Sequence, residues 1–131
     1  MSTIEQKSKA SPAKLAGGMN LTRFKQLIQK PTIIDIGDSW CTPCKQFAPK
    51  FAALHAMNPM ICFLKLDCEV DEDIMKYIAT TKAGEIDAVP AILLFNKGSF
   101  VIRVDASVRE IVTAAKEHLE INLMKPLSAS R

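Results

Sequence analysis

Apolar residues recur along the chain at two different spacings, and each spacing predicts one kind of secondary structure. Spacings of three and four residues predict four helices, at 19–30, 41–57, 71–81 and 107–119. Short apolar runs with β-branched residues predict four strands, at 32–36, 61–66, 91–95 and 100–104. Helices and strands are therefore expected to alternate as far as residue 90, and two consecutive strands and a final helix to follow.

Turn and capping residues mark where these elements begin and end. Pro31 ends the first helix, because the residue before a proline is pushed out of the helical conformation. Residues 96–98, with the sequence Asn-Lys-Gly, predict a hairpin turn, so the last two strands are expected to be antiparallel. Ser107 and Glu110 form a capping box at the start of the last helix. Because strands joined through helices pair in parallel, the whole pattern predicts a three-layer α/β sandwich.

Composition and charge narrow the class of protein. The 131 residues are 48% apolar and 24% charged, which indicates one globular domain. No apolar run approaches the roughly 20 residues that a membrane-spanning helix needs, so no membrane partner is expected. The net charge of +3 arises in the first 30 residues, since 31–131 hold 11 basic and 13 acidic residues. No basic stripe with interleaved aromatic residues is predicted on the body, so nucleic acid is not an expected partner.

The predicted elements divide the chain into an N-terminal extension at 1–18, one domain at 19–123 and a C-terminal tail at 124–131. The extension lacks the apolar core of a secretory signal peptide, so we expect a cytoplasmic protein. Its Ser, Lys and Ala content resembles that of an organelle transit peptide, but such peptides are usually rich in Arg, and the first Arg here is Arg23. A flexible, basic, solvated extension is the preferred interpretation, and the domain is expected to be a monomer.

Two of the four cysteines form the motif Trp40-Cys41-Thr42-Pro43-Cys44, between a predicted strand and a predicted helix. Free N–H groups and the dipole at the helix start stabilise a thiolate, so the pKa of Cys41 should fall from about 8.5 toward neutrality. Cys44 follows one turn later on the apolar stripe and should be shielded. This arrangement predicts a two-step exchange, in which Cys41 attacks a target disulfide and Cys44 resolves the mixed disulfide. Pro43 stiffens the first turn without the loss of an intrahelical hydrogen bond.

A Cys-x-x-Cys motif also forms half of many zinc sites. The 17 residues between Cys44 and Cys62 fit such a site, but the five between Cys62 and Cys68 do not, because a zinc knuckle has about two there. Cys62 alternates within a predicted strand, as a core residue does. We therefore expect no metal, and no cofactor besides a redox-active Cys41–Cys44 disulfide. Whether Cys68 is an inert thiol or a regulatory one stays open.

The cysteine motif and two blocks that follow it resemble the thioredoxin family, at the family's spacings and in its order. The resemblance covers about 24–119 and rests on the blocks IIDIGDSWCTPCKQFAP, FLKLDCEVDED and AVPAILLFNKG. It implies a three-layer α/β/α thioredoxin-like sandwich with a central mixed sheet of four to five strands. The prediction leaves four and five strands as alternatives, because 1–18 contain no convincing counterpart of the family's first strand.

The resemblance gives two charged residues a place beside the cysteines. Asp35 aligns with a buried Asp of the family that shuttles a proton to the resolving cysteine. A carboxyl group within the apolar run 33–36 should also have a raised pKa, as a general base near neutrality requires. Lys65 aligns with the partner of that Asp. A solvated lysine on an outward strand face is the alternative for Lys65.

The resemblance also implies a substrate-binding surface around the cysteine pair. Pro90 aligns with a cis proline of the family, and Val89 before it would present its backbone to an extended substrate peptide. Trp40 would flank the same groove. The implied substrate-binding residues are Trp40, Thr42, Pro43, Val89, Pro90, Asp105 and Ala106.

Several residues depart from the family pattern near this surface, among them Gly37, Thr42 and Asp105. Thr42 stands where the common family member has Gly, and it should shift the reduction potential. Gly37 stands where many members carry an aromatic residue, which loosens the floor of the site. Asp105 stands where the family has Gly, and its charge should narrow the targets toward basic surfaces.

The sequence thus predicts an enzyme, a thiol–disulfide oxidoreductase that reduces protein disulfides through Cys41 as nucleophile and Cys44 as resolving residue. Such an electron-transport role implies two partners, a thioredoxin-reductase-like electron donor and disulfide-containing target proteins. The alternative function is a thioredoxin-like partner-binding adaptor or redox sensor without general reductase activity. The departures at Gly37, Thr42 and Asp105 would then tune the site to one partner.

Overall fold

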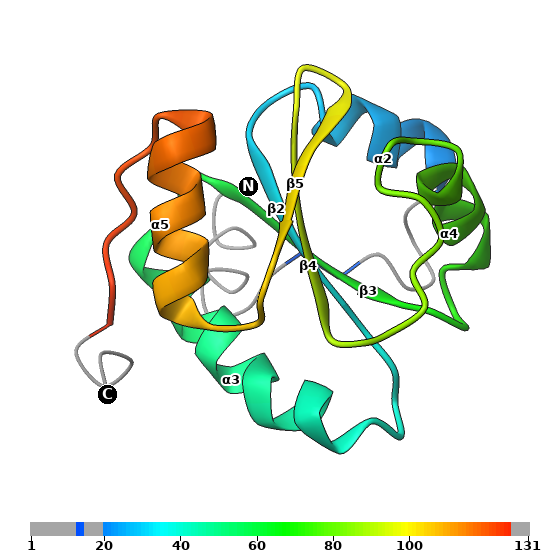
Figure 1. Cartoon of the computed structure of the whole chain (residues 1–131), viewed down its shortest axis with the longest axis horizontal. Helices are drawn as coiled ribbons and strands as arrows, with labels where there is room; N and C mark the ends of the chain where they lie inside the picture. Colours follow the sequence, from blue (N-terminus) through cyan, green and yellow to red (C-terminus); the bar gives the residue numbers. More distant parts are fainter. Residues whose placement is uncertain (1–12, 15–19, 127–131) are drawn as a thin grey trace, which may run out of the picture.

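A mixed β-sheet forms the centre of the computed structural model, which describes residues 13–14 and 20–126 (Figure 1). Its five strands lie in the order β1-β3-β2-β4-β5. Their bounds are β1 Ala13–Lys14, β2 Thr32–Gly37, β3 Cys62–Asp67, β4 Ala91–Asn96 and β5 Ser99–Val104. The helices around the sheet are α2 Leu21–Leu27, α3 Thr42–Met57, α4 Glu72–Ala79 and α5 Val108–Leu119.

The pairing of the strands makes β2 the centre of the sheet. It pairs in parallel with β3 on one side and antiparallel with β4 on the other. The outer pairs are β1 with β3, in parallel, and β4 with β5, antiparallel. Since neighbours cover both edges of β2 and helices cover both faces, every one of its residues is buried. Strands buried in this way read as continuous apolar runs, as 33–36 does apart from its Asp.

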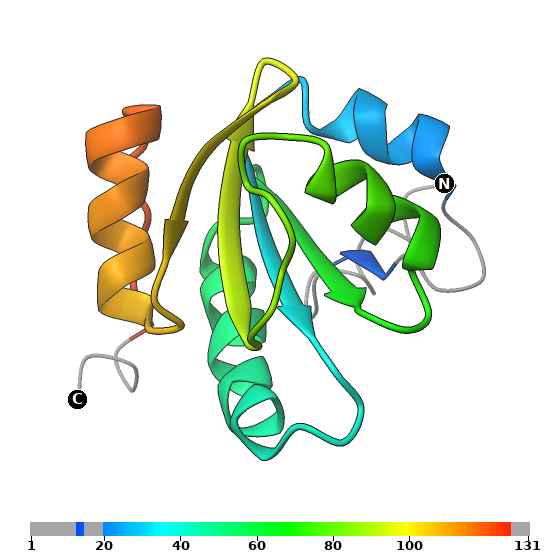
Figure 2. The same cartoon turned by 45° about the vertical axis from the view of Figure 1, so that its right-hand side comes forward.

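Alternation along the strands divides the core into two layers. Ile33 and Phe63 point to one face, where they pack against α3 and α5. Ile34 and Leu64 point to the other face, where they pack against α2 and α4. Figure 2 shows the sheet between these two pairs of helices. The same alternation sends Asp35, Gly37 and Lys65 to the α3 face.

The predicted elements are present, and their ends differ from the predicted ones by at most three residues. The largest change is at α2, which begins after its N-cap Asn20 and ends three residues before the predicted end. The sheet has five strands, the larger of the two numbers expected. Its fifth strand, β1, lies in 1–18, where no convincing strand was expected, because two residues are too few for a periodic pattern. The other residues of 1–18 lie outside the described part of the chain.

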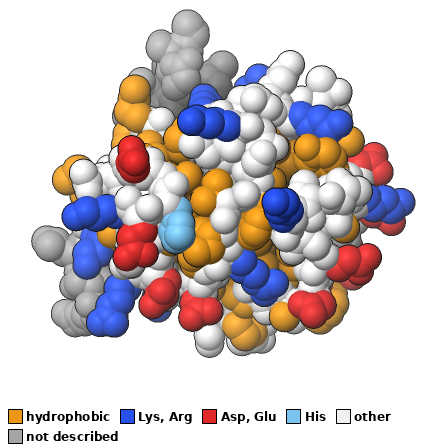
Figure 3. All heavy atoms as spheres, turned by 45° about the horizontal axis from the view of Figure 1, so that its top comes forward, with side chains coloured by type: hydrophobic (Ala, Val, Ile, Leu, Met, Phe, Trp, Pro, Cys, Tyr) orange, Lys and Arg blue, Asp and Glu red, His pale blue; other side chains and the backbone are white. Residues whose placement is uncertain are grey.

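The surface is mixed in charge. On the face drawn in Figure 3, basic and acidic side chains of the described residues are interspersed among apolar ones. In that part of the chain no helix is long and apolar enough to cross a bilayer.

One buried amide joins the end of α3 to the segment after α5. The side chain of Asn58 donates to the carbonyl oxygens of Leu54, at 2.8 Å, and Met124, at 2.9 Å. Its Oδ1 accepts from the Met124 N–H at 2.8 Å. Leu123 beside it is buried in the α3–α5 core. Met124, which the sequence assigns to the tail, is therefore bonded to the folded domain.

We predict that Asn58→Ala lowers the free energy of unfolding by about 2 kcal/mol, because it removes three hydrogen bonds of about 1 kcal/mol each, part of which water replaces. Urea unfolding followed by circular dichroism measures the change. Asn122→Ala is the matched control, since it removes an exposed amide from the same segment and should change stability by about 0.5 kcal/mol or less. Equal stability of the Asn58 and Asn122 variants would contradict the role given to Asn58.

Candidate functional site

The two cysteines of the motif form a disulfide at the start of α3. Cys41 is the N-cap of the helix, and its Sγ accepts a hydrogen bond from the Cys44 N–H at 3.2 Å. This bond and the helix dipole stabilise negative charge on Cys41 in the reduced state. Cys44 is 3% exposed and lies on the inward stripe with Phe47 and Phe51, as predicted. The helix start thus gives the two sulfur atoms unequal environments.

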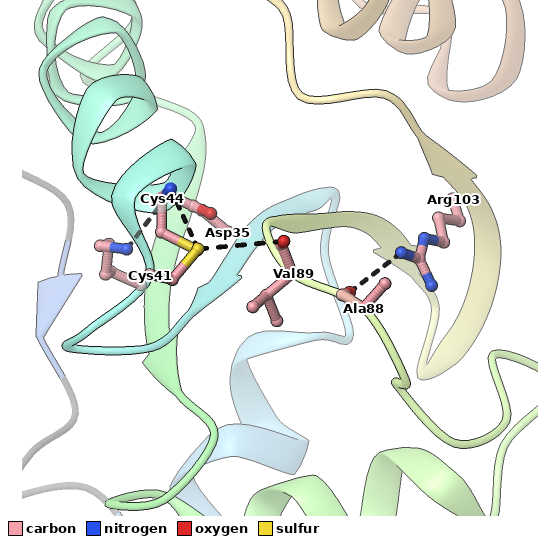
Figure 4. The surroundings of a disulfide bond; sticks show 7 residues. Asp35, Cys41, Cys44, Ala88, Val89 and Arg103 are labelled. Atoms are coloured by element: carbon pink, nitrogen blue, oxygen red, sulfur yellow. Dashed lines mark hydrogen bonds and ion pairs between the residues drawn. A yellow bond between two sulfur atoms is a disulfide. The ribbon is translucent and has the colours of Figure 1, made fainter.

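The loop before β4 faces Cys41 (Figure 4). The Val89–Pro90 peptide bond is cis, as the alignment of Pro90 with the family's cis proline implies. The Val89 carbonyl oxygen lies 3.9 Å from the Cys41 Sγ. In the disulfide this is a contact only, because the sulfur carries no proton. The Val89 backbone thus lies next to the Cys41 sulfur.

A groove of about 230 Å³ adjoins this loop. Three predicted substrate-binding residues from separate elements line this groove: Pro43, Pro90 and Ala106. The rest of the lining comes from α3 and consists of Gln46, Phe47 and Lys50. Trp40 is 69% exposed, and Thr42 and Asp105 are exposed as well. None of these last three lines the groove, so their side chains are available at the surface around it.

Asp35 and Lys65 form an ion pair beneath the cysteines. The β2–β3 register places the two residues side by side, and Lys65 Nζ lies 3.2 Å from Asp35 Oδ2. The Asp35 side chain is 1% exposed and that of Lys65 28%. Burial raises the pKa of Asp35 above its ordinary value, although the charge and hydrogen bond of Lys65 act in the opposite direction. The structure thus favours the paired reading of Lys65 over a solvated lysine.

Arg103 of β5 is a site residue that the sequence did not reveal. Its guanidinium donates to the carbonyl oxygen of Ala88 at 3.1 Å, one residue before Val89. Figure 4 shows this side chain crossing from β5 to the loop. Arg103 therefore helps to hold the loop that faces Cys41. The alternating pattern of β5 predicts that Arg103 faces outward. It does not predict the contact with Ala88, because the two residues are 15 positions apart in the sequence.

Comparison with known proteins identifies the family to which this fold and site belong. The family model described as Thioredoxin matches residues 18–119, which is most of the chain. The chain belongs to the thioredoxin family. The resemblance seen in the sequence blocks is confirmed.

Curated thioredoxins from distant organisms match the same region. Thioredoxin C-3 from Corynebacterium nephridii is 30% identical over 92 residues, which are 70% of this chain and 59% of that protein. Thioredoxin H-type 2 from Nicotiana tabacum is 33% identical over 102 residues, which are 78% of this chain and 75% of the relative. Thioredoxin membership and the Cys41–Cys44 disulfide together support dithiol–disulfide exchange as the chemistry of this domain.

Solved thioredoxin structures share the architecture. Mitochondrial thioredoxin 3 from Saccharomyces cerevisiae, in its oxidised form, superimposes with a TM-score of 0.64 at 27% identity and covers 87% of this chain and 99% of its own. Thioredoxin F from spinach chloroplast, in its long form, gives 0.68 at 24% identity, with 88% and 93% covered, a likeness of fold alone. The predicted three-layer α/β/α thioredoxin-like sandwich is confirmed.

The other two cysteines of this thioredoxin are free thiols. Both are half-buried, and burial raises the pKa of each; the carboxylates of Asp38 and Asp67 raise that of Cys68 further. Raised pKa values keep both groups as thiols near neutrality. Within the described residues, no cluster of three or more His, Cys, Asp or Glu side chains is arranged to hold a metal ion.

We predict that Asp35→Asn stabilises the fold at pH 8 and that this gain shrinks as the pH falls toward 4. The folded-state pKa of Asp35 is raised, so ionisation costs the native state more than the unfolded state, and stability is lost as the pH rises through this range. Thermal unfolding across pH 4–8 measures the difference. Asp87→Asn, at an exposed position, is the control. A stability difference between Asp35→Asn and the parent that did not vary with pH would refute the assignment.

Proposed function

We propose that this thioredoxin reduces disulfide bonds of other proteins. The observation that carries the proposal is the position of Cys41, next to the Val89 backbone and close to the groove formed by Pro43, Pro90 and Ala106. An extended peptide laid along Val89, as an added strand lies along a sheet edge, would bring its disulfide to Cys41. Cys44 lies behind Cys41, away from that peptide.

The reaction proceeds in two exchanges. The Cys41 thiolate attacks one sulfur of the target disulfide, a Cys41–target bond forms, and the other target sulfur leaves as a thiolate that takes up a proton. Cys44 then gives its proton to the Asp35 carboxylate and attacks Cys41 Sγ. The mixed disulfide breaks, the second target thiolate leaves, and the Cys41–Cys44 disulfide is formed. The raised pKa of Asp35 suits this general-base role.

Return to the dithiol requires two electrons from a donor. We propose a thioredoxin-reductase-like flavoprotein in this role, as the sequence resemblance implies. A thioredoxin f2 of similar fold has been solved in complex with ferredoxin:thioredoxin reductase, with a TM-score of 0.66 at 23% identity. That likeness concerns the fold alone, so the donor class rests on the resemblance of the cysteine motif to the family's.

We also propose a cytoplasmic location and a monomeric state. A reducing compartment would keep the free thiols Cys62 and Cys68 unpaired, as they are in the structure. Fractionation of source cells and light scattering of the purified chain test these two points.

We predict that Cys41→Ser lowers insulin reduction by dithiothreitol to the uncatalysed rate, because the attacking thiolate is lost. Cys44→Ser should retain the first exchange and accumulate mixed disulfides with targets, seen on non-reducing gels. Cys68→Ser is the control, with activity equal to that of the parent chain. The scheme would be wrong if Cys41→Ser kept full activity or if Cys44→Ser trapped no target.

The adaptor alternative rests on the exposed charge of Asp105 beside the groove. If this charge selects basic targets, Asp105→Asn should lower kcat/KM about two- to fivefold for peptides with Lys next to the disulfide, the effect of one exposed ion pair. Glu117→Gln removes the same charge from an exposed position on α5 and should change nothing. Unchanged selectivity in Asp105→Asn would remove the support for a tuned site. A Cys41→Ser variant that still bound one cellular partner tightly would favour the adaptor.

A further inference from the structure

The stretch before β4 has few hydrogen bonds of its own. Residues 82–90 form neither helix nor strand. The side chain of Val89 packs against the α2–α4 core. Along the backbone of 85–88, the described residues supply one hydrogen bond, from the Arg103 guanidinium to the Ala88 carbonyl oxygen. Arg103 is therefore the polar restraint on the orientation of this backbone.

Arg103 is anchored in the sheet. It lies in β5, where its register partner is Leu93 of β4. β4 is buried and pairs with β2 on its other edge. The guanidinium reaches back past the start of β4 to Ala88, as Figure 4 shows. The sheet thus fixes one end of the contact, and a planar group with several donors holds the other.

The contact fixes a peptide plane that Ala88 shares with Val89. The Ala88–Val89 bond is trans, so its C=O and N–H point in opposite directions. Because the oxygen is held on the side of β5, the Val89 N–H points away from Arg103. No described carbonyl oxygen accepts a hydrogen bond from this N–H. The Val89 carbonyl oxygen is also directed away from Arg103, toward Cys41 (Figure 4). The donor and the acceptor of Val89 are therefore both presented on the side of the disulfide.

A peptide that adds to Val89 as a strand needs both of these groups. In a hydrogen-bonded antiparallel pair, one residue exchanges both its N–H and its C=O with the residue opposite. If the Ala88–Val89 plane turned, the N–H would leave this position and one of the two bonds would be lost. One hydrogen bond changes binding about two- to tenfold. A plane that is already held in place also lowers the entropy cost of binding.

We propose that Arg103 is a positioning residue for the peptide substrates of this thioredoxin. It acts through Ala88, by holding the Val89 N–H toward a bound peptide, rather than by contact with the reacting sulfur atoms. A disulfide carried by a peptide should therefore react faster because of Arg103, whereas a small disulfide without peptide bonds should not. This inference rests on the proposed reduction of protein disulfides and names a residue that supports it.

The test compares two oxidants of the reduced full chain. One is a disulfide-closed peptide without charged side chains, and the other is 2-hydroxyethyl disulfide, which has no peptide bonds. The fluorescence of Trp40, the single tryptophan, which adjoins Cys41, follows both reactions. We expect Arg103→Gln to lower the second-order rate constant for the peptide about two- to tenfold and to leave that for 2-hydroxyethyl disulfide unchanged. Arg109→Gln removes the same charge from an exposed position on α5 and should change neither.

The ratio of the two rate constants is measured on one preparation, so a smaller folded fraction in a variant does not change it. The loss should lie in the peptide concentration at half-saturation and not in the maximal rate. A peptide whose amides beside the cysteine are N-methylated cannot pair with Val89, so it should react equally with the parent and Arg103→Gln.

Three outcomes would overturn the inference. They are an equal ratio in the parent and Arg103→Gln, an equal loss for both disulfides, and an Arg103 effect that persists with the methylated peptide. Insulin reduction by the same preparations separates this inference from the proposed function. A parent chain that reduced neither insulin nor the peptide would refute the proposed function, whereas an active parent with an unchanged ratio refutes only the role of Arg103.

Discussion

The complete burial of β2 is the constraint on which the site depends. A strand covered on both faces and both edges has no freedom to slip, so each of its side chains has a fixed face and a fixed neighbour. This fixes Asp35 next to Lys65 and places its carboxyl on the α3 face, beneath the disulfide. The cost of a buried carboxyl is visible in its raised pKa, which Lys65 offsets only in part. A group that costs stability in this way suits proton transfer.

The start of α3 gives Cys41 and Cys44 different reactivity, although their side chains are identical. Cys41 is the N-cap, where a helix leaves its first N–H groups without partners, and the Cys44 N–H bonds to its sulfur. Cys44 falls one turn later, where the helix faces the core. The helix begins between the two cysteines. This local feature therefore determines which sulfur is the better nucleophile and leaving group. The loop held by Arg103 then determines what reaches Cys41 from outside.

Features with a local pattern could be predicted from the sequence, and features made by distant contacts could not. The buried stripe of α3, its capping by the cysteine motif and the strands around Asp35 follow from periodicity and turn residues. The cis bond at Pro90 followed only from the family resemblance, because the residues around it are unremarkable. Three features depend on segments far apart in the chain. They are the hydrogen bond from Arg103 to Ala88, the hydrogen bonds between Asn58 and Met124, and the pairing of the two-residue strand β1 with β3. The spacing of apolar residues along the chain does not indicate contacts between such distant segments.

Gly37 links the two halves of the site. The missing side chain leaves Lys65 partly exposed, and water near an ammonium group weakens its attraction for a carboxylate. The ion pair with Asp35 is accordingly too weak to cancel the effect of burial on that carboxyl, whose pKa stays raised. An added Cβ at Gly37 would also lie 3.2 Å from Cys44 Cβ and 3.4 Å from Cys44 Sγ, so the residue at this position packs directly against the buried cysteine as well. One glycine thus adjoins both Lys65, the partner of the proton acceptor, and Cys44, and a side chain at this position would change the surroundings of both together.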